Sequence, residues 1–87
     1  MPGVTEEAIA VCDEMIGRFG DASEFPLREQ VAKALYSKGL MLGLLDRREE
    51  EIAVYDEVVK RFGEASEPPL REIVADAQIG RKKFQIS

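Results

Sequence analysis

An internal duplication constrains this chain more than any other feature of its sequence. When residues 7–34 are aligned with residues 50–77, at an offset of 43, the two segments are identical at 19 of 28 positions. Repeats of this length are built from stacked units, none of which can bury its apolar face alone. The sequence therefore predicts one domain, residues 1–87, in which two copies pack against each other.

The two copies do not correspond over their whole length. The first comprises residues 7–49 and the second residues 50–87. The ten pairs that follow the matched segments, residues 35–44 against 78–87, share no identity. The second copy thus diverges after residue 77, and we expect its tail either to cap the array or to be foreign sequence.

The first helix of each copy is predicted from the spacing of its apolar residues. Between residues 4 and 19 they recur every three or four positions, which is the period of one helix face. This stripe consists of Val4, Ala8, Ile9, Cys12, Met15, Ile16 and Phe19. Thr5 is placed to cap the start, and Gly20 follows the end, where positive φ is common. The second copy repeats the pattern over residues 49–62, closed by Gly63.

The other helix of each copy begins at a proline, which suits the first turn because its missing N–H has no partner there. One helix is expected over residues 26–45, and another from Pro68 or Pro69 that frays over residues 80–83. Their inward-facing residues are Leu27, Val31, Ala34, Leu35, Leu42 and Leu45, and Leu70, Ile73, Val74 and Ala77. A short turn at Asp46 makes the middle two helices an antiparallel hairpin. No segment alternates with the period of a strand, so the prediction is an all-α fold of about four helices.

The composition excludes most enzyme classes. The chain has no His and only one Cys, which removes the commonest general base and every zinc site built from those ligands. Cys12 lies on the apolar stripe and is expected to be a small core residue rather than a nucleophile. The adjacent carboxylates of Glu49, Glu50 and Glu51 point in different directions from a helix, so they do not converge on an ion. We expect no catalytic residue, no metal and no cofactor.

The charge and the hydropathy narrow the set of partners. Lys and Arg number 12 against 17 Asp and Glu, a net charge of −5, which speaks against a nucleic-acid partner. The longest apolar run, residues 40–45, is too short to cross a membrane. The first residues lack the pattern of a secretory signal, and a single Cys fits a reducing compartment. A cytoplasmic location is therefore expected.

The residues at the predicted helix crossings resemble the tetratricopeptide repeat (TPR) family. The first-helix positions are Leu35, Gly39 and Leu42, and the second-helix positions are Glu51, Tyr55 and Val58, or Ala8, Cys12 and Met15 in the other copy. The period of 43 exceeds the family's usual period of about 34 residues. Asp46 stands where Gly is typical, and Glu51 replaces a small residue, so its side chain should be splayed or paired. The resemblance implies antiparallel helical hairpins in a short right-handed α-solenoid.

The TPR family holds a segment of a partner on a concave surface lined by the first helices. In this chain the resemblance implies that the partner-binding residues are Lys33, Tyr36, Ser37, Leu40 and Leu44, continued by Asp76, Ile79 and Lys83. This patch is apolar with few charges, which favours an apolar or helical peptide, or another copy of the chain. We therefore expect a non-catalytic protein-interaction or assembly scaffold.

Several alternatives stay open at this point. Leu40 and Leu44 could simply pack within the stack. The chain could be a peptide-sensing regulatory fragment of a larger enzyme or signalling protein, whereas a small hydrolase or metal enzyme is disfavoured because no polar cluster converges. Apolar flanks at both ends favour a homo-oligomer. Lys82, at the position equivalent to Gly39, argues against a helix stacking at the carboxyl end as closely as helices do inside the chain.

Overall fold

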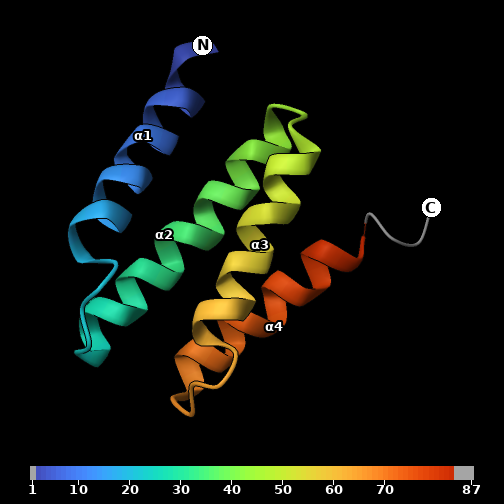
Figure 1. Ribbon diagram of the computed structural model, residues 1–87. Coiled ribbons are helices and arrows are strands. Elements are labelled where there is room, and N and C mark those ends of the chain that lie inside the picture. The colour runs from blue at the N-terminus through green and yellow to red at the C-terminus, as the bar shows by residue number, and fades with distance from the viewer. Residues whose placement is uncertain (1, 84–87) are drawn as a thin grey trace.

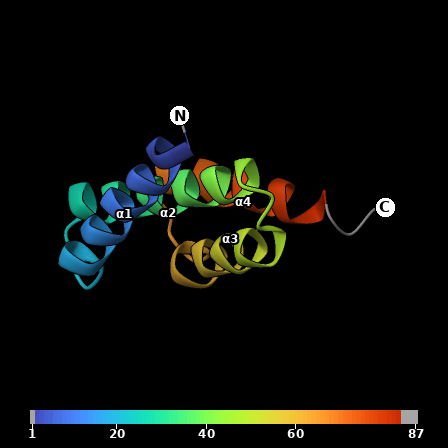
Figure 2. The same ribbon diagram turned by 90° about the horizontal axis from the view of Figure 1, so that it is seen from above.

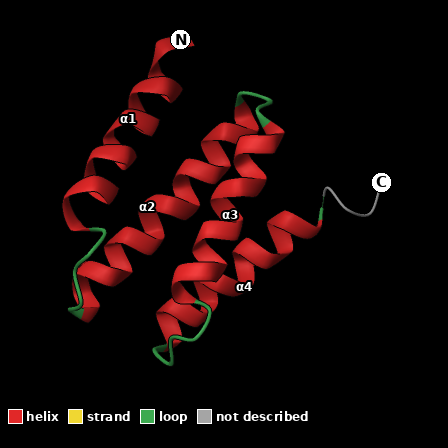
Figure 3. Cartoon of the chain, viewed as in Figure 1, coloured by secondary structure: helices red, strands yellow, loops and turns green. Residues whose placement is uncertain are grey.

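The chain folds into four helices joined by short connections (Figure 1). The computed structural model describes residues 2–83. The helices are α1 (Pro2–Phe19), α2 (Phe25–Leu44), α3 (Arg48–Phe62) and α4 (Pro68–Lys82). The described residues contain no strand (Figure 3), so the all-α class and the number of helices are confirmed. The last part of the divergent tail, residues 84–87, lies outside the described residues.

α2 is the central element of the arrangement. Each helix runs antiparallel to the one before it (Figure 1), and α2 packs against α1, α3 and α4. Seen from above, α2 and α4 lie in one layer, with α3 in the other (Figure 2). The Cα extents are 34 × 30 × 15 Å. The smallest of these leaves room for only two layers, because packed helices lie about 8–10 Å apart.

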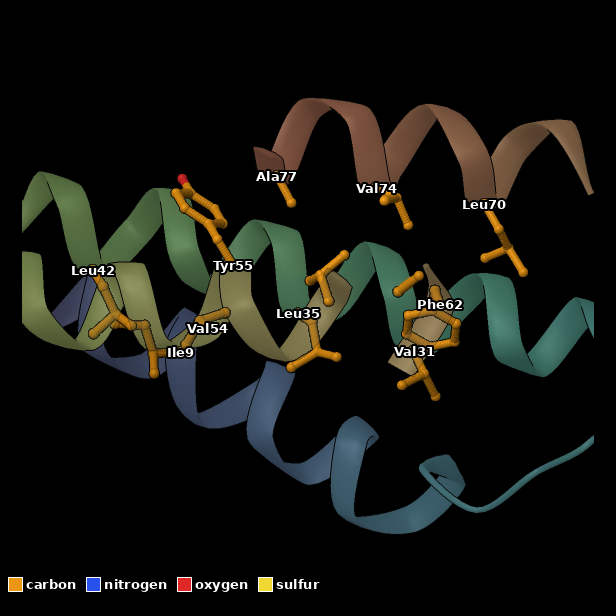
Figure 4. Packing of buried hydrophobic residues seen from close by; sticks show 12 residues of the cluster. Ile9, Val31, Leu35, Leu42, Val54, Tyr55, Phe62, Leu70, Val74 and Ala77 are labelled. Carbon is orange, nitrogen blue, oxygen red and sulfur yellow. The ribbon is translucent and has the colours of Figure 1, made fainter. Parts of the chain in front are cut away.

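The core lies mainly between α2, α3 and α4. Their buried apolar side chains form one cluster, in which Leu70, Val74 and Ala77 approach from one side and Ile9 of α1 from another (Figure 4). The cluster consists of Ile9, Val31, Ala32, Leu35, Leu42, Val54, Tyr55, Val58, Phe62, Leu70, Val74 and Ala77. Most residues predicted to face inward from α2 and α4 are buried. Leu27, Leu45 and Ile73 are half-buried.

α1 is less buried than its sequence pattern predicted. Of the predicted stripe only Ile9 is buried, whereas Val4 is 55% and Phe19 is 36% exposed. Cys12, expected in the core, is half-buried. The reason is that α1 packs against one helix, α2, while α3 is covered by both α2 and α4. One flank of the apolar stripe of α1 is therefore not covered by another helix.

Two predictions about helix ends are wrong. α1 begins at Pro2, so Thr5 lies inside the helix and does not cap it; proline is well tolerated at the first position. No glycine among the described residues has a positive φ, and Gly63 has φ −60°. Glycine is needed there for a different reason, because a Cβ on Gly63 would lie 2.4 Å from the Val59 carbonyl oxygen. The same close approach to the helix's own backbone occurs at Gly20.

The turn between α2 and α3 is closed by Asp46. It has φ 60°, the one positive φ of a non-glycine residue in the described part of the chain. The Arg47 N–H donates to the Leu42 carbonyl at 2.9 Å and the Asp46 N–H to the Gly43 carbonyl at 3.1 Å, the bond pair of a Schellman motif. Asp tolerates left-handed geometry better than most residues, so the predicted tight turn is confirmed.

α4 ends at Lys82, inside residues 80–83 where its end was expected. In this segment Arg81 Nη1 donates to Asp56 Oδ1 of α3 at 2.7 Å. The pair has a counterpart in the first copy, where Lys38 Nζ lies 2.6 Å from Asp13 Oδ1. Both members are offset by 43 residues, so the structural correspondence of the copies extends beyond the point where sequence identity ends.

Candidate protein-interaction surface

The residues predicted to bind a partner lie along one side of α2 and of α4. Apart from the adjacent Tyr36 and Ser37, neighbouring members within each helix are three or four positions apart, which places them on a common side. They are Lys33, Tyr36, Ser37, Leu40 and Leu44 on α2, and Asp76, Ile79 and Lys83 at α4 and its end. This set is named here the α2–α4 face. Tyr36 and Ser37 are half-buried, and the other members are exposed.

The large apolar side chains of the α2–α4 face are not covered. Leu40 is 48%, Leu44 is 78% and Ile79 is 58% exposed. The alternative in which Leu40 and Leu44 pack within the stack is therefore wrong. α2 contacts α1, α3 and α4, and the exposed fractions show that none of these helices covers Leu40 or Leu44.

Tyr36 joins the two halves of the α2–α4 face. Its ring centroid lies 5.7 Å from that of Tyr55, with the rings tilted by 33°. Partial burial raises the pKa of the Tyr36 hydroxyl, and the charges of Asp76 and Glu51 raise it further. α2 and α4 pack against each other, and the Tyr55 ring beside Tyr36 also lies against Gly80 of α4. The α2 and α4 parts of the face therefore meet near Tyr36.

Beneath Tyr36, the Tyr55 ring is held between two glycines. A Cβ on Gly39 of α2 would lie 2.4 Å from Tyr55 Cε1, and a Cβ on Gly80 of α4 would lie 2.7 Å from Tyr55 Cε2. The two glycines therefore allow α2 and α4 to approach the ring this closely. Sequence reasoning identified Gly39 and Tyr55 but missed Gly80. A signal was available, because a glycine inside a helix costs about 1 kcal/mol and usually has a packing reason.

Glu51 is a buried carboxylate that supports this arrangement. Only 8% of the residue is exposed, and Tyr55 Oη donates a hydrogen bond of 2.9 Å to its Oε2. The carboxylate fits because a Cβ on Gly43 would lie 2.9 Å from both of its oxygens. Glu51 was expected to be splayed or paired rather than packed: it is paired with Tyr55, but it is also packed in the interior. Burial, then the hydrogen bond and charge of Glu51, raise the pKa of Tyr55, so the phenol stays a donor.

The geometry of the three adjacent glutamates agrees with the expectation that they point apart. Glu51 is turned inwards to Tyr55, whereas Glu50 pairs with Arg47 at the surface. In residues 2–83 no three His, Cys, Asp or Glu side chains gather closely enough to hold a metal ion. Burial and the charge of Asp13 raise the pKa of the Cys12 thiol, against an opposing effect of Lys38, which keeps the thiol in its unreactive protonated form.

A polar contact that sequence reasoning did not single out joins the two copies near the start of α2. Arg28 Nη1 donates to Glu67 Oε2 at 3.1 Å, and the guanidinium lies 6.0 Å from the centroid of the Phe62 ring. A cation over an aromatic ring is attracted to its face. The contact borders a hollow of about 340 Å³, and it fixes the second copy against the first.

Comparisons of the chain with family models, curated proteins and solved structures give no match. In the described part of the chain, none of the helices combines the length and the apolar character needed to cross a membrane.

Proposed function

We propose that this protein is a non-catalytic interaction module that binds an apolar or helical segment of a protein partner on the α2–α4 face. The observation that carries the proposal is the exposure of Leu40 and Leu44 on the central helix. α2 has apolar residues on all sides, as helices do when they are covered on all sides. Three sides contact α1, α3 and α4; the fourth carries Leu40 and Leu44 at 48% and 78% exposure.

The proposed architecture is a TPR-like stack of two hairpins, a short right-handed α-solenoid. Three features support it. Each helix packs on the next along the chain, α2 also packs on α4, and Gly39 lies where α2 crosses the Tyr55 ring. In such a stack α2 and α4 are neighbouring first helices, so the α2–α4 face corresponds to the surface that holds the partner in TPR proteins.

The chemistry of the face indicates the kind of ligand. Its apolar residues run from Leu44 and Leu40 to Ile79, with the Tyr36 ring between the helices. The charges at its edges are of both signs: Lys33, which pairs with Glu29 at 3.2 Å, Asp76 and Lys83. A patch of this kind fits a segment with two or three apolar anchors at helical spacing and few charges.

The proposal is tested with a displayed library of random peptides. Peptides selected on the wild-type protein are expected to carry apolar residues at positions i and i+3 or i+4. Their affinity, measured by fluorescence polarisation, should fall at least about tenfold in Leu40→Glu and in Ile79→Glu, because a charge in an apolar contact must be desolvated. Both side chains are exposed, so both variants should fold.

The matched control is Val4→Glu, which makes the same change at a residue of α1 that is 55% exposed. It should leave peptide affinity unchanged. Amide NMR signals should shift on peptide binding in α2 and α4 and not in α1. A library that selects no binder, or peptides that bind Leu40→Glu as well as wild type, would reject the α2–α4 face as the binding site.

A further inference from the structure

The outward flank of α1 is exposed, whereas the equivalent side of α3 is buried. Val11 is 63% exposed, whereas its counterpart in α3, Val54, is 9% exposed; Phe19 is 36% and its counterpart Phe62 is 6% exposed. A third pair behaves in the same way, since Met15 is half-buried and Val58 fully buried. α3 is packed against both α2 and α4, and Arg28 of α2 lies over the Phe62 ring. The flank of α1 is thus shaped to receive a helix of the same type as α2.

α4 is the helix of this chain that is equivalent to α2 and still has that side free. On α2 the side that faces α3 carries Arg28, over the Phe62 ring, and Gly39, against the Tyr55 ring. Ala32 and Leu35 lie between them at helical spacing on the same side. The equivalent residues of α4, 43 positions later, are Arg71, Ala75, Gln78 and Lys82. All four are exposed. This set is named here the rear face, and the outward flank of α1 (Val4, Ala8, Val11, Met15 and Phe19) the front face.

We propose that copies of the chain stack head to tail, with the rear face of one copy on the front face of the next, as α2 stacks on α3 within the chain. This partner is a second copy and not the segment bound by the α2–α4 face. The two surfaces are separate, so either proposal can fail without the other.

Charge complementarity supports this pairing. Inside the chain Arg28 pairs with Glu67 and lies over Phe62. The equivalent residues at the junction between copies are Arg71 on the rear face and Glu24 and Phe19 beside the front face. Neither Arg71 nor Glu24 has an ion pair within residues 2–83. At the junction between copies, Arg71 and Glu24 would pair with each other, as Arg28 and Glu67 do inside the chain.

The sizes of the opposed residues also match. From the sequence, close stacking at the carboxyl end was not expected, because Lys82 stands at the position equivalent to Gly39. Gly39, however, has to be small because it lies against the Tyr55 ring. At the junction the residue in the place of Tyr55 is Cys12, whose small side chain leaves room for the stem of Lys82. In the internal interface Gly39 is thus opposed by the large Tyr55, and at the junction between copies the large Lys82 would be opposed by the small Cys12.

A symmetric contact between two α1 helices fits less well. The front face is flanked by Glu7, Glu14 and Arg18, which are exposed, and Arg18 lies 3.9 Å from Glu14. An antiparallel α1 pair would bring the carboxylates of the two copies together with only Arg18 to offset them. The rear face instead contributes Arg71 and Lys82. Because Gln78 replaces Leu35 there, less apolar area is buried than in the internal interface, and the association should be reversible and grow with concentration.

The test uses two full-length variants, each blocked on one face. Val11→Glu places a charge in the front face, and Ala75→Glu places one in the rear face. Both residues are exposed in the single chain, so circular dichroism should show unchanged helix content. Wild type is expected to form species larger than a dimer in sedimentation equilibrium, and each variant to stay at the monomer mass of 9.7 kDa. An equimolar mixture should form only a 1:1 pair, because one free front face and one free rear face remain.

Charge exchange tests the register. Glu24→Arg and Arg71→Glu should each weaken association about tenfold, and the double variant, which restores the pair at every junction, should recover most of the loss. Leu40→Glu, on the α2–α4 face, should change nothing in this assay. A wild type that is monomeric at millimolar concentration would overturn the proposal. So would a dimer that Val11→Glu abolishes and Ala75→Glu leaves intact, since that is the symmetric α1 contact.

Discussion

At the scale of single residues, the close packing of the helices depends on glycines. Gly39 and Gly80 lie on either side of the Tyr55 ring, and Gly43 lies against the Glu51 carboxylate that the ring's hydroxyl contacts. Two helices therefore approach α3 closely enough to bury a large aromatic residue and a charged one at the same crossing. A glycine in a helix lowers its intrinsic stability, so these positions are maintained by packing rather than by helix propensity.

Gly39→Ala is expected to destabilise the protein by about 1–3 kcal/mol, the usual cost of overpacking a core. The added Cβ would lie 2.4 Å from the buried ring, which has no free volume into which to move. The matched control is Gly17→Ala in α1, where a Cβ meets nothing within 4 Å; it should stabilise by about 0.5–1 kcal/mol. Urea unfolding followed by circular dichroism measures both. Shifts of the same sign would contradict the packing argument.

The two tyrosines should make stability fall at high pH. Burial raises the pKa of both hydroxyls above about 10, the ordinary value for a tyrosine side chain. As the pH rises through about 10, the unfolded chain releases these protons before the folded protein does. The stability that they contribute is therefore complete below that pH and is lost above it. Tyrosinate absorbance should rise at a higher pH in the native protein than in urea, and Tyr55→Phe should flatten the alkaline loss of stability. Coinciding titrations would refute this.

At the scale of the helices, α1 differs from the other three. It packs only against α2 and contributes Ile9 as its one buried residue in the core cluster. α3, by contrast, is packed between two neighbours and contributes four residues to that cluster, Val54, Tyr55, Val58 and Phe62. An element with few buried contacts opens at a lower free energy than the whole domain, so the two copies, although similar in sequence, should not be equally stable.

Native-state hydrogen exchange should therefore find the α1 amides exchanging through a local opening, below the free energy of global unfolding that governs α2 and α3. Ile9→Ala should lower protection in α1 while leaving α3 nearly unchanged. Leu42→Ala, at a residue of α2 that is 2% exposed, should instead cost about 2–5 kcal/mol and lower protection in every helix. The experiment is done at a concentration where the chain is monomeric, and equal protection in α1 and α3 there would contradict this argument.

At the scale of the whole molecule, the sequence predicted the fold class correctly but did not predict every helix end correctly. Periodicity, prolines and the short turn at Asp46 were enough for four antiparallel helices, because each of these signals acts locally. The same logic misplaced the start of α1. Thr5 is a capable cap, but the helix begins earlier, at Pro2, and α4 is held to Lys82 by a contact with another helix, Arg81 to Asp56.

The sequence by itself determined the secondary structure and the duplication, since amphipathic spacing and turn chemistry depend on residues a few positions apart. Only the tertiary structure decided which flank of each helix is covered. Residues 7–19 of α1 and 50–62 of α3 are identical at 8 of 13 positions, yet Val11 is exposed and its identical counterpart Val54 is buried. The difference lies in the number of neighbours, which no local pattern encodes. The exposed Leu40 and Leu44 follow from the same cause: burial belongs to the packing of all four helices and not to any one of them.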